Sequence, residues 1–260
     1  MSLYKTTLIT GASQGIGLSL ANEFAKNGHD LVLVARSEDK LLKIAQNLGA
    51  QYDIKVTPLP FDLIPTGSAI KLFTQLAEME ITIDILVNNA GMMQVEKLYE
   101  SDMDVMNNLM QLNINSLVNM TRLFVGPMLS RGYGKVINVA SIASFMPTPT
   151  FSVYGASKAF VLSFSESIAE EMKDSGISVT CVCPGFTQTD MLSHAEGLEK
   201  YIPTFLKASP EGLAADAYKA AMNNEVIFID KLANKMLVQW AKHYPRWIVR
   251  GVTGFFSRFT

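Results

Sequence analysis

The sequence predicts an α/β fold: a doubly wound parallel sheet of about seven strands, helices on both faces, and amphipathic helices at the C-terminal end. Three observations predict it. Short apolar runs alternate with longer helical patterns, and a glycine-rich turn joins the first run to the first helix. The 260 residues are 48% hydrophobic, which is ample for the core of one large domain.

Seven apolar runs are expected to be strands, because each is short, rich in branched side chains and bounded by turn residues. They are Tyr4 to Thr10, Leu31 to Ala35, Ile54 to Leu59, Ile83 to Val87, Lys135 to Ala140, Ile177 to Cys183 and Val226 to Ile229. Strands that alternate with helices form βαβ units with parallel strands. No repeat or linker divides residues 1–230, so these are expected to be a single domain, with residues 231–260 as a helical extension.

The glycine-rich turn runs from Thr10 to Gly17, between the first strand and an amphipathic helix expected over Leu18 to Asn27. Glycines allow a tight turn and let phosphates approach the N–H groups of a helix N-terminus, whose dipole favours anions. Such turns are common in isolation. Between a first strand and a helix, the turn is the expected dinucleotide site of a Rossmann-type fold.

The end of the second strand bears on the choice of cofactor. An acidic residue there would bind the ribose 2′-hydroxyl of NAD, whereas an arginine suits the 2′-phosphate of NADP. Ala35 supplies no carboxylate and Arg36 supplies a cation. The sequence therefore favours NADP(H) over NAD(H). The alternative is a solvated Arg36 that begins a helix, and Gln14 stands where a basic residue would have strengthened the case.

Two later segments are also expected near the cofactor. Asp62 follows the third strand and either accepts a hydrogen bond from adenine or caps the next helix. Asn88-Asn89-Ala90-Gly91 follows the fourth strand, where small side chains let a turn pack against the cofactor. Asparagines then interrupt a long helical pattern from Ser101 to Leu129, and one of them is expected to bend that helix and hold a water.

The chemistry is expected in the opening turns of a helix that begins near Tyr154. Residues four apart share a helical face, so Tyr154 and Lys158 can enter one site. A cation at roughly 4 Å, with an effective dielectric of about 20, would lower the tyrosine pKa by about 3 units toward ~7. Alone, the pattern is more often a surface pair. Ser141, after the strand that ends at Ala140, would open into the crevice beyond the strand ends.

Together these motifs resemble the short-chain dehydrogenase/reductase family, from Thr10 to about Thr189. The resemblance implies hydride transfer between a nicotinamide and a carbonyl or secondary alcohol. It implies Tyr154 as the general acid or base and Ser141 as the residue that holds the substrate oxygen. Lys158 would bind the nicotinamide ribose, and Asn113 would position a water. Asn113 is preferred to Asn115 because it stands eight residues before Thr121, although Ser116 replaces a glycine frequent in the family.

The resemblance also implies a set of cofactor-binding residues and a homodimer or homotetramer. Within the family, the chain resembles more loosely an NADP-using branch that includes bacterial general oxidoreductases and hydroxysteroid and 3-ketoacyl reductases. The long helices around residues 102–129 and 152–172 would form the subunit contacts. The implied cofactor-binding residues are Gly11, Ser13, Gln14, Gly15, Ile16, Gly17, Arg36, Asp62, Leu63, Asn89, Ala90, Gly91, Tyr154, Lys158, Pro184, Gly185, Thr187 and Thr189.

The segments after Ser141 and after Pro184 are strongly apolar, which predicts a hydrophobic carbonyl or alcohol as substrate. Their apolar residues are Phe145, Met146, Phe151, Phe186, Met191, Leu192, Tyr201, Ile202, Phe205 and Leu206. The alternative for any one of them is ordinary packing within its own domain. The competing hypothesis for the whole chain is a catalytically silent NADP(H)-binding sensor or scaffold.

Charge is unevenly distributed. The formal net charge of −2 argues against nucleic-acid binding, yet residues 231–260 hold six Lys/Arg and no acids. On either side of Pro245, apolar residues recur every three or four positions, which predicts two amphipathic helices. They are Leu232, Met236 and Trp240, then Ile248, Val252, Phe255 and Phe259. Docking of this face on the body or on a second subunit is expected, and contact with a membrane surface is the alternative.

The N-terminus lacks the apolar segment of a signal peptide and no run of ~20 apolar residues occurs, so a cytoplasmic protein is expected. Cys181 and Cys183 alternate on one strand face and are expected to be buried thiols. His29, His194 and His243 lack the spacing of metal ligands and are expected in loops or at the surface, so no metal site is predicted.

Overall fold

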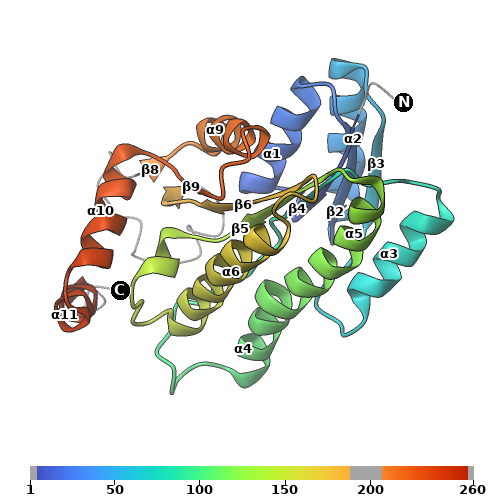
Figure 1. Cartoon of the computed structure of the whole chain (residues 1–260). Helices are drawn as coiled ribbons and strands as arrows, with labels where there is room; N and C mark the ends of the chain where they lie inside the picture. Colours follow the sequence, from blue (N-terminus) through green and yellow to red (C-terminus); the bar gives the residue numbers. More distant parts are fainter. Residues whose placement is uncertain (1–4, 188–206, 257–260) are drawn as a thin grey trace.

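The computed structural model describes residues 5–187 and 207–256. Its centre is a seven-stranded sheet in the order β3-β2-β1-β4-β5-β6-β9, with every pair parallel (Figure 1). The strands are β1 (Thr6–Thr10), β2 (Asp30–Ala35), β3 (Val56–Pro60), β4 (Ile85–Asn88), β5 (Gly134–Val139), β6 (Ile177–Cys183) and β9 (Ile227–Ile229). The predicted doubly wound sheet is confirmed. Strand order reverses between β1 and β4, where such sheets bind ligands.

Helices cover both faces of this sheet (Figure 1). One face carries α1 (Gly15–Lys26), α2 (Glu38–Tyr52) and α9 (Pro210–Met222), and the other carries α3 (Ser68–Glu78), α5 (Leu117–Arg131) and α6 (Ser152–Glu171). A short α4 (Met103–Met110) continues through a π-helix, η1 (Gln111–Ser116), into α5. Beyond the main sheet, β7 (Phe186–Thr187) pairs with β8 (Lys207–Ala208); each is too short to show a sequence pattern.

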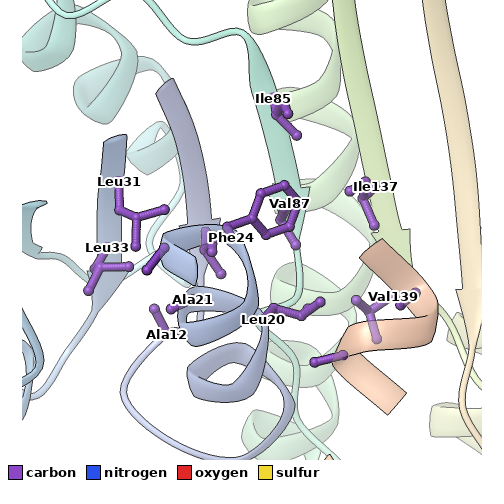
Figure 2. Packing of buried hydrophobic residues seen from close by; sticks show 14 of the residues in the cluster. Ala12, Leu20, Ala21, Phe24, Leu31, Leu33, Ile85, Val87, Ile137 and Val139 are labelled. Atoms are coloured by element: carbon purple, nitrogen blue, oxygen red, sulfur yellow. The ribbon is translucent and has the colours of Figure 1, made fainter. Parts of the chain in front are cut away.

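Alternating side chains divide the core between the two faces of the sheet. Leu31 and Leu33 of β2 pack under α1, whereas Val32 and Val34 pack toward α3 and α5. This follows from the two-residue period of a strand. Figure 2 shows Leu20, Ala21 and Phe24 of α1 turned toward strand side chains that include Val87 and Ile137. The core thereby holds the N-terminal end of α1 over the carboxyl ends of the strands.

His29 lies in the turn before β2, which agrees with the expected loop or surface position, but its side chain is buried. Its ring nitrogens hydrogen-bond with the Thr7 hydroxyl and with the Tyr218 hydroxyl, each at 3.2 Å. The Phe24 ring meets it edge-on at 5.0 Å. The sequence did not show this because Tyr218 reaches the site only when α9 packs on α1. Cys181 and Cys183 are buried free thiols, as predicted.

The two predicted C-terminal helices are α10 (Leu232–His243) and α11 (Arg246–Phe256), beyond the β9 edge of the sheet (Figure 1). The face of α10 that packs on the body is Asn234, Val238 and Ala241. Leu232 and Met236 are instead exposed, so of the two expected docking partners, the body and a second subunit, the body leaves these two side chains uncovered. A periodic pattern identifies an apolar stripe but not what covers it. In residues 5–187 and 207–256, each helix is too short or too polar to span a lipid bilayer.

Candidate active site

A cavity of about 390 Å³ opens at the carboxyl ends of the strands, within the usual size range of small-molecule sites. It gathers segments that follow six strands of the sheet, β1 to β6. The sequence-predicted residues that line it are Gly11, Ser13, Gln14, Gly15, Ile16, Gly17, Arg36, Asp62, Leu63, Asn89, Ala90, Gly91, Ser141, Tyr154, Lys158, Pro184, Gly185 and Thr187. Thr189 lies outside the described residues, and the Asn113 side chain does not line the cavity.

The glycine turn is packed tightly against the end of β4. A Cβ at Gly17 would lie 2.2 Å from the Gly11 carbonyl oxygen and 2.5 Å from Asn89 Nδ2, and Gly11 itself has a φ of +66°. Asn89 Nδ2 donates to the Thr10 carbonyl at 2.9 Å, which fixes the turn. The first N–H groups of α1 have no partner within the helix, and they lie where the turn meets the cavity. This arrangement fits the phosphates of a dinucleotide.

Thr10 joins the first crossover to the fourth, a role that the sequence reasoning did not assign. Its hydroxyl donates to the Val87 carbonyl at 3.2 Å and accepts from the N–H groups of Asn89 and Ala90, each at 3.0 Å. The position of this threonine at the last residue of β1 was the available signal. The hydroxyl holds the Asn89-Ala90 turn in place beside the glycine turn.

Two basic residues lie at the β2 end of the cavity. Arg36 is exposed and lines the cavity, at the first position after β2. Lys40 was not singled out from the sequence, yet its Nζ donates to Gln14 Oε1 at 3.2 Å, beside the glycine turn. Its place one helical turn after Arg36 was the signal. The glycine turn thus has a basic neighbour, although residue 14 is not basic.

Asp62 lines the cavity, but it does not cap the next helix. Its Oδ1 accepts from the N–H of Ile64 at 3.0 Å, and α3 starts only at Ser68 with Gly67 at its N-cap. The capping alternative is therefore wrong, because a further turn, closed by a bond from Ser68 N to Pro65 O, separates Asp62 from the helix.

Ser141, Tyr154 and Lys158 come together because β5 and α6 meet at this end of the sheet. Tyr154 and Lys158 lie on consecutive turns of α6, and the Ser141 side chain hydrogen-bonds with the Tyr154 phenol. Lys158 Nζ donates to the Val139 carbonyl at 2.8 Å and lies 5.7 Å from the centroid of the Tyr154 ring. Ser144 Oγ donates to the Lys158 carbonyl at 2.8 Å, which ties η2 (Ile142–Phe145) to α6.

The pKa of Tyr154 differs from the expected value near 7. Burial raises the tyrosine pKa above its ordinary value, and the hydrogen bond with Ser141 offsets only part of this. Burial also lowers the pKa of Lys158 to about 8. The expected depression of the tyrosine pKa is wrong for this structure, because loss of solvation dominates and the ammonium is directed at Val139. Tyr154 therefore holds its proton at neutral pH.

Asn113 lies in the π-helix η1, so the predicted interruption of the long helix occurs at one of its asparagines. Its Oδ1 accepts from Met92 N at 2.8 Å, and its Nδ2 donates to Met92 O at 2.9 Å and to Ser157 Oγ at 3.1 Å. Asn113 therefore joins the loop after β4 to α6. Single-turn π-helices occur frequently at functional sites. Nearby, Ser116 donates to the Leu63 carbonyl at 3.1 Å.

The cavity beside Ser141 is apolar. Met146, Phe151 and Phe186 line it, as predicted, but Phe145 does not, because it packs under α6 and α10. The other predicted residues of this region lie outside the described part of the chain. Further apolar residues that line the cavity include Met92, Met93, Leu112 and Leu237. The two methionines directly follow the Asn-Asn-Ala-Gly segment, whereas Leu237 is brought there only by the docking of α10.

Comparison with known proteins decides the family. Residues 5–198 match the family model described as short chain dehydrogenase. The chain belongs to the short-chain dehydrogenase family. As a short-chain dehydrogenase it is an oxidoreductase of alcohol and carbonyl groups.

Three similar proteins represent the relatives of this short-chain dehydrogenase. The very-long-chain 3-oxoacyl-CoA reductase of Rattus norvegicus is 33% identical over 216 residues, which are 82% of this chain and 67% of the relative. A Sphingobium yanoikuyae short-chain dehydrogenase solved in complex with NADPH has a TM-score of 0.82 and 33% identity, covering 92% of this chain and 93% of the other. A Comamonas testosteroni alcohol dehydrogenase, described as bulky-bulky ketone specific, has a TM-score of 0.78 and 28% identity, covering 92% of each chain.

Proposed function

We propose that the protein is an NADP(H)-dependent carbonyl reductase that acts on hydrophobic ketones or aldehydes and, in reverse, on secondary alcohols. One observation carries the proposal. A single cavity has the glycine turn and Arg36 at one end, and Ser141 and Tyr154 among apolar side chains at the other. Such a cavity can hold a dinucleotide and place a carbonyl next to a proton donor.

Support for NADP(H) comes from charge at the β2 end of the cavity. Arg36 offers a planar, permanently charged guanidinium for a phosphate, and Lys40 lies beside the glycine turn. No carboxylate follows β2 at Ala35 or Arg36 to bind an unphosphorylated ribose. The similar Sphingobium yanoikuyae enzyme was solved with NADPH. When bound, this cofactor supplies the hydride, and the residues of the chain orient the two reactants.

In the proposed reduction, Tyr154 is the general acid. Its raised pKa keeps the phenol protonated at neutral pH, as proton donation to a carbonyl oxygen requires. Ser141 donates a second hydrogen bond to that oxygen and stabilises the negative charge that develops there. The Lys158 ammonium is assigned to the nicotinamide ribose, and Asn113 to the position of a water that returns protons to the site.

The substrate class follows from the side chains at the Ser141 end of the cavity. Met92, Met146, Phe151 and Phe186 offer apolar contacts to a substrate but no charge. The named substrates of two similar proteins, a very-long-chain 3-oxoacyl-CoA and bulky ketones, are consistent with a lipophilic ketone here. We therefore assign the cavity to ketones with long or bulky apolar substituents.

A screen of NADPH oxidation tests this function. We expect turnover of aliphatic ketones and 3-ketoesters to rise with apolar chain length, and NADPH to be preferred to NADH. Product analysis should show the alcohol. Binding of NADPH without oxidation by any carbonyl would instead support the silent sensor or scaffold, and turnover confined to small polar sugars would refute the assigned substrate class.

The assembly and the compartment are parts of the same proposal. Phe160 of α6 is exposed and stacks on Phe164 at 5.9 Å, so this face offers apolar area to a second subunit. We propose a homodimer or homotetramer through the faces of α4, α5 and α6, and light scattering measures the assembly directly.

We propose the cytoplasm as the compartment. Cys181 and Cys183 are unoxidised with their Sγ atoms 3.8 Å apart, which is compatible with the reducing cytoplasm.

A further inference from the structure

Large apolar side chains are exposed along both C-terminal helices. Leu232 and Met236 of α10 are 73% and 65% exposed, and Trp247 and Phe255 of α11 are 68% and 56% exposed. We call these four residues, with Val252, the tail surface. The helices lie at the edge of the molecule beyond β9 (Figure 1). Several large apolar residues exposed on one element usually mark a contact surface.

The arrangement of α11 is that of a helix at an interface. Val249 is buried, whereas Trp247, Val252 and Phe255 are exposed. Arg246 and Arg250, four residues apart, form a row along the helix next to Trp247. A helix with an aromatic apolar face bordered by basic residues is suited to the boundary between lipid headgroups and acyl chains.

Charge distinguishes between the two partners that could cover the tail surface, a second copy of the chain and a lipid bilayer. Residues 231–260 carry six Lys/Arg and no acids. Lys235, Lys242, Arg246 and Arg250 are exposed, and none of them forms an ion pair within the described part of the chain. A symmetric contact with a second copy would bring two such basic segments together, which is unfavourable. An anionic bilayer offers negative headgroups and an apolar interior together.

We propose that the tail surface docks the protein on an anionic lipid bilayer. Trp247 and Phe255 enter the headgroup region, and the basic residues of α10 and α11 contact acidic headgroups. The binding is peripheral and reversible, because it depends on a modest apolar area and on charges that salt screens.

The position of α10 connects this docking to the cavity, and this part of the inference rests on the proposed function. Leu237 of α10 lines the cavity, and Lys242 lies 4.8 Å from the Phe145 ring in the adjoining η2. Docking therefore brings the cavity near the bilayer, where lipophilic ketones concentrate. The substrate class is accordingly that of membrane-dissolved carbonyl compounds.

Vesicle co-sedimentation of the full chain tests the docking. We expect binding to phosphatidylcholine vesicles that contain phosphatidylserine, little binding to phosphatidylcholine alone, and release as salt increases. Trp247→Ser should weaken binding roughly tenfold, and Arg246→Glu with Arg250→Glu roughly 30-fold or more. The matched controls are Leu98→Ser, at a residue 60% exposed elsewhere, and Lys43→Glu on α2; both should bind as the wild type does.

Three results would overturn the docking: no binding to either vesicle, equal binding of the Trp247→Ser variant, or a soluble dimer that Trp247→Ser dissociates while the wild type ignores lipid. The last result would assign the tail surface to a second copy. Vesicle binding is measured without cofactor or substrate. The proposed function is measured separately, as turnover of a water-soluble ketone in buffer. Failure of the docking and failure of the proposed function are therefore separate observations.

Discussion

The Lys158 ammonium is buried, and its Nζ donates to a backbone carbonyl, Val139 O. Among the described residues it has no carboxylate partner, so desolvation lowers its pKa to about 8 from the ordinary 10.5. Between these two pH values the unfolded chain binds more protons than the folded chain. The free energy of unfolding contributed by this group therefore rises with pH across that window and is lower at neutral pH.

A pH profile tests the charge of Lys158. We expect kcat/KM for carbonyl reduction to be flat below about pH 8 and to fall above it, because deprotonation removes the ammonium assigned to the ribose. Lys158→Arg keeps a charge at all these pH values, so its activity, although lower, should not fall with pH in this range. A wild-type profile that stays flat to pH 10 would contradict the role.

Arg36 provides a test of cofactor choice. Arg36→Ala should raise KM for NADPH about 10- to 100-fold, the loss expected for a charge-assisted hydrogen bond to phosphate. KM for NADH should change less than about twofold, since NADH lacks that phosphate. Steady-state kinetics with both cofactors measures this, and Lys40→Ala is the companion variant. Equal effects on NADPH and NADH would discredit the assignment.

For individual residues, the sequence indicated which of them meet, but it indicated less about their environment. Ser141, Tyr154 and Lys158 could be predicted to share a site because strand ends and helical spacing are local properties. The pKa of Tyr154 could not, since it depends on how much solvent the folded cavity removes. Lys40 was missed because its contact with Gln14 requires α2 to lie beside the glycine turn.

Among the elements, the turn into α1 is packed tightly around Gly17. Gly17→Ala would place a Cβ 2.2 Å from the Gly11 carbonyl, so the turn must move. We expect NADPH binding to weaken at least about tenfold and the free energy of unfolding to fall by about 1–3 kcal/mol. Fluorescence titration and urea unfolding measure both quantities.

Gly251 in α11 is the matched control for that variant. A Cβ there meets nothing within 4 Å, so Gly251→Ala should leave NADPH binding unchanged and add up to about 1 kcal/mol of stability. If Gly17→Ala and Gly251→Ala bound NADPH equally well, the cofactor site would not depend on the tight packing at Gly17.

The π-helix η1 shows how far an element could be predicted. Asparagines in the apolar pattern indicated an interruption, but five of them stood in the segment. Asn113 is distinguished by its three bonds to Met92 and Ser157, residues that are distant in sequence. In α10 the pattern likewise identified an apolar stripe, whereas the packed face contains the buried Asn234.

In the whole molecule, the C-terminal extension is joined to the cavity through Asp230. Its buried Oδ1 accepts from the N–H of Gly185, which lines the cavity, and from Asn234 Nδ2 of α10, each at 2.8 Å. Burial raises the pKa of this carboxyl above its ordinary value. We therefore propose that residues 231–260 pack on the catalytic domain as a structural part of it, while Leu232, Met236, Trp247, Val252 and Phe255 stay exposed.

Deletion of residues 231–260 tests this arrangement. It removes the buried Val238, Ala241 and Val249 and leaves Asp230 without Asn234. We expect the free energy of unfolding to fall by about 3 kcal/mol or more, and NADPH binding to weaken. Urea unfolding provides the measurement. A truncated chain with an unchanged unfolding midpoint would show that the extension is independent of the domain.

The seven strands of the main sheet were predictable because their apolar runs are short and regularly spaced. Sheet order and the positions of α9 and α10 were not, since both depend on contacts between residues far apart in the sequence, such as those of Tyr218 and Leu237. The chain's charge asymmetry was visible at once. Only the structure could show that the basic helices leave aromatic side chains exposed.

Deuterium transfer from 4-deuterated NADPH to a lipophilic ketone, in the wild type and in Tyr154→Phe, tests directly whether Tyr154 is the proton donor of a carbonyl reductase. We expect labelled alcohol from the wild type. Tyr154→Phe should bind NADPH within about twofold of the wild type but form product at least about a thousandfold more slowly, because the proton donor is absent. Labelled product from Tyr154→Phe at a rate within tenfold of the wild type would contradict this role of Tyr154.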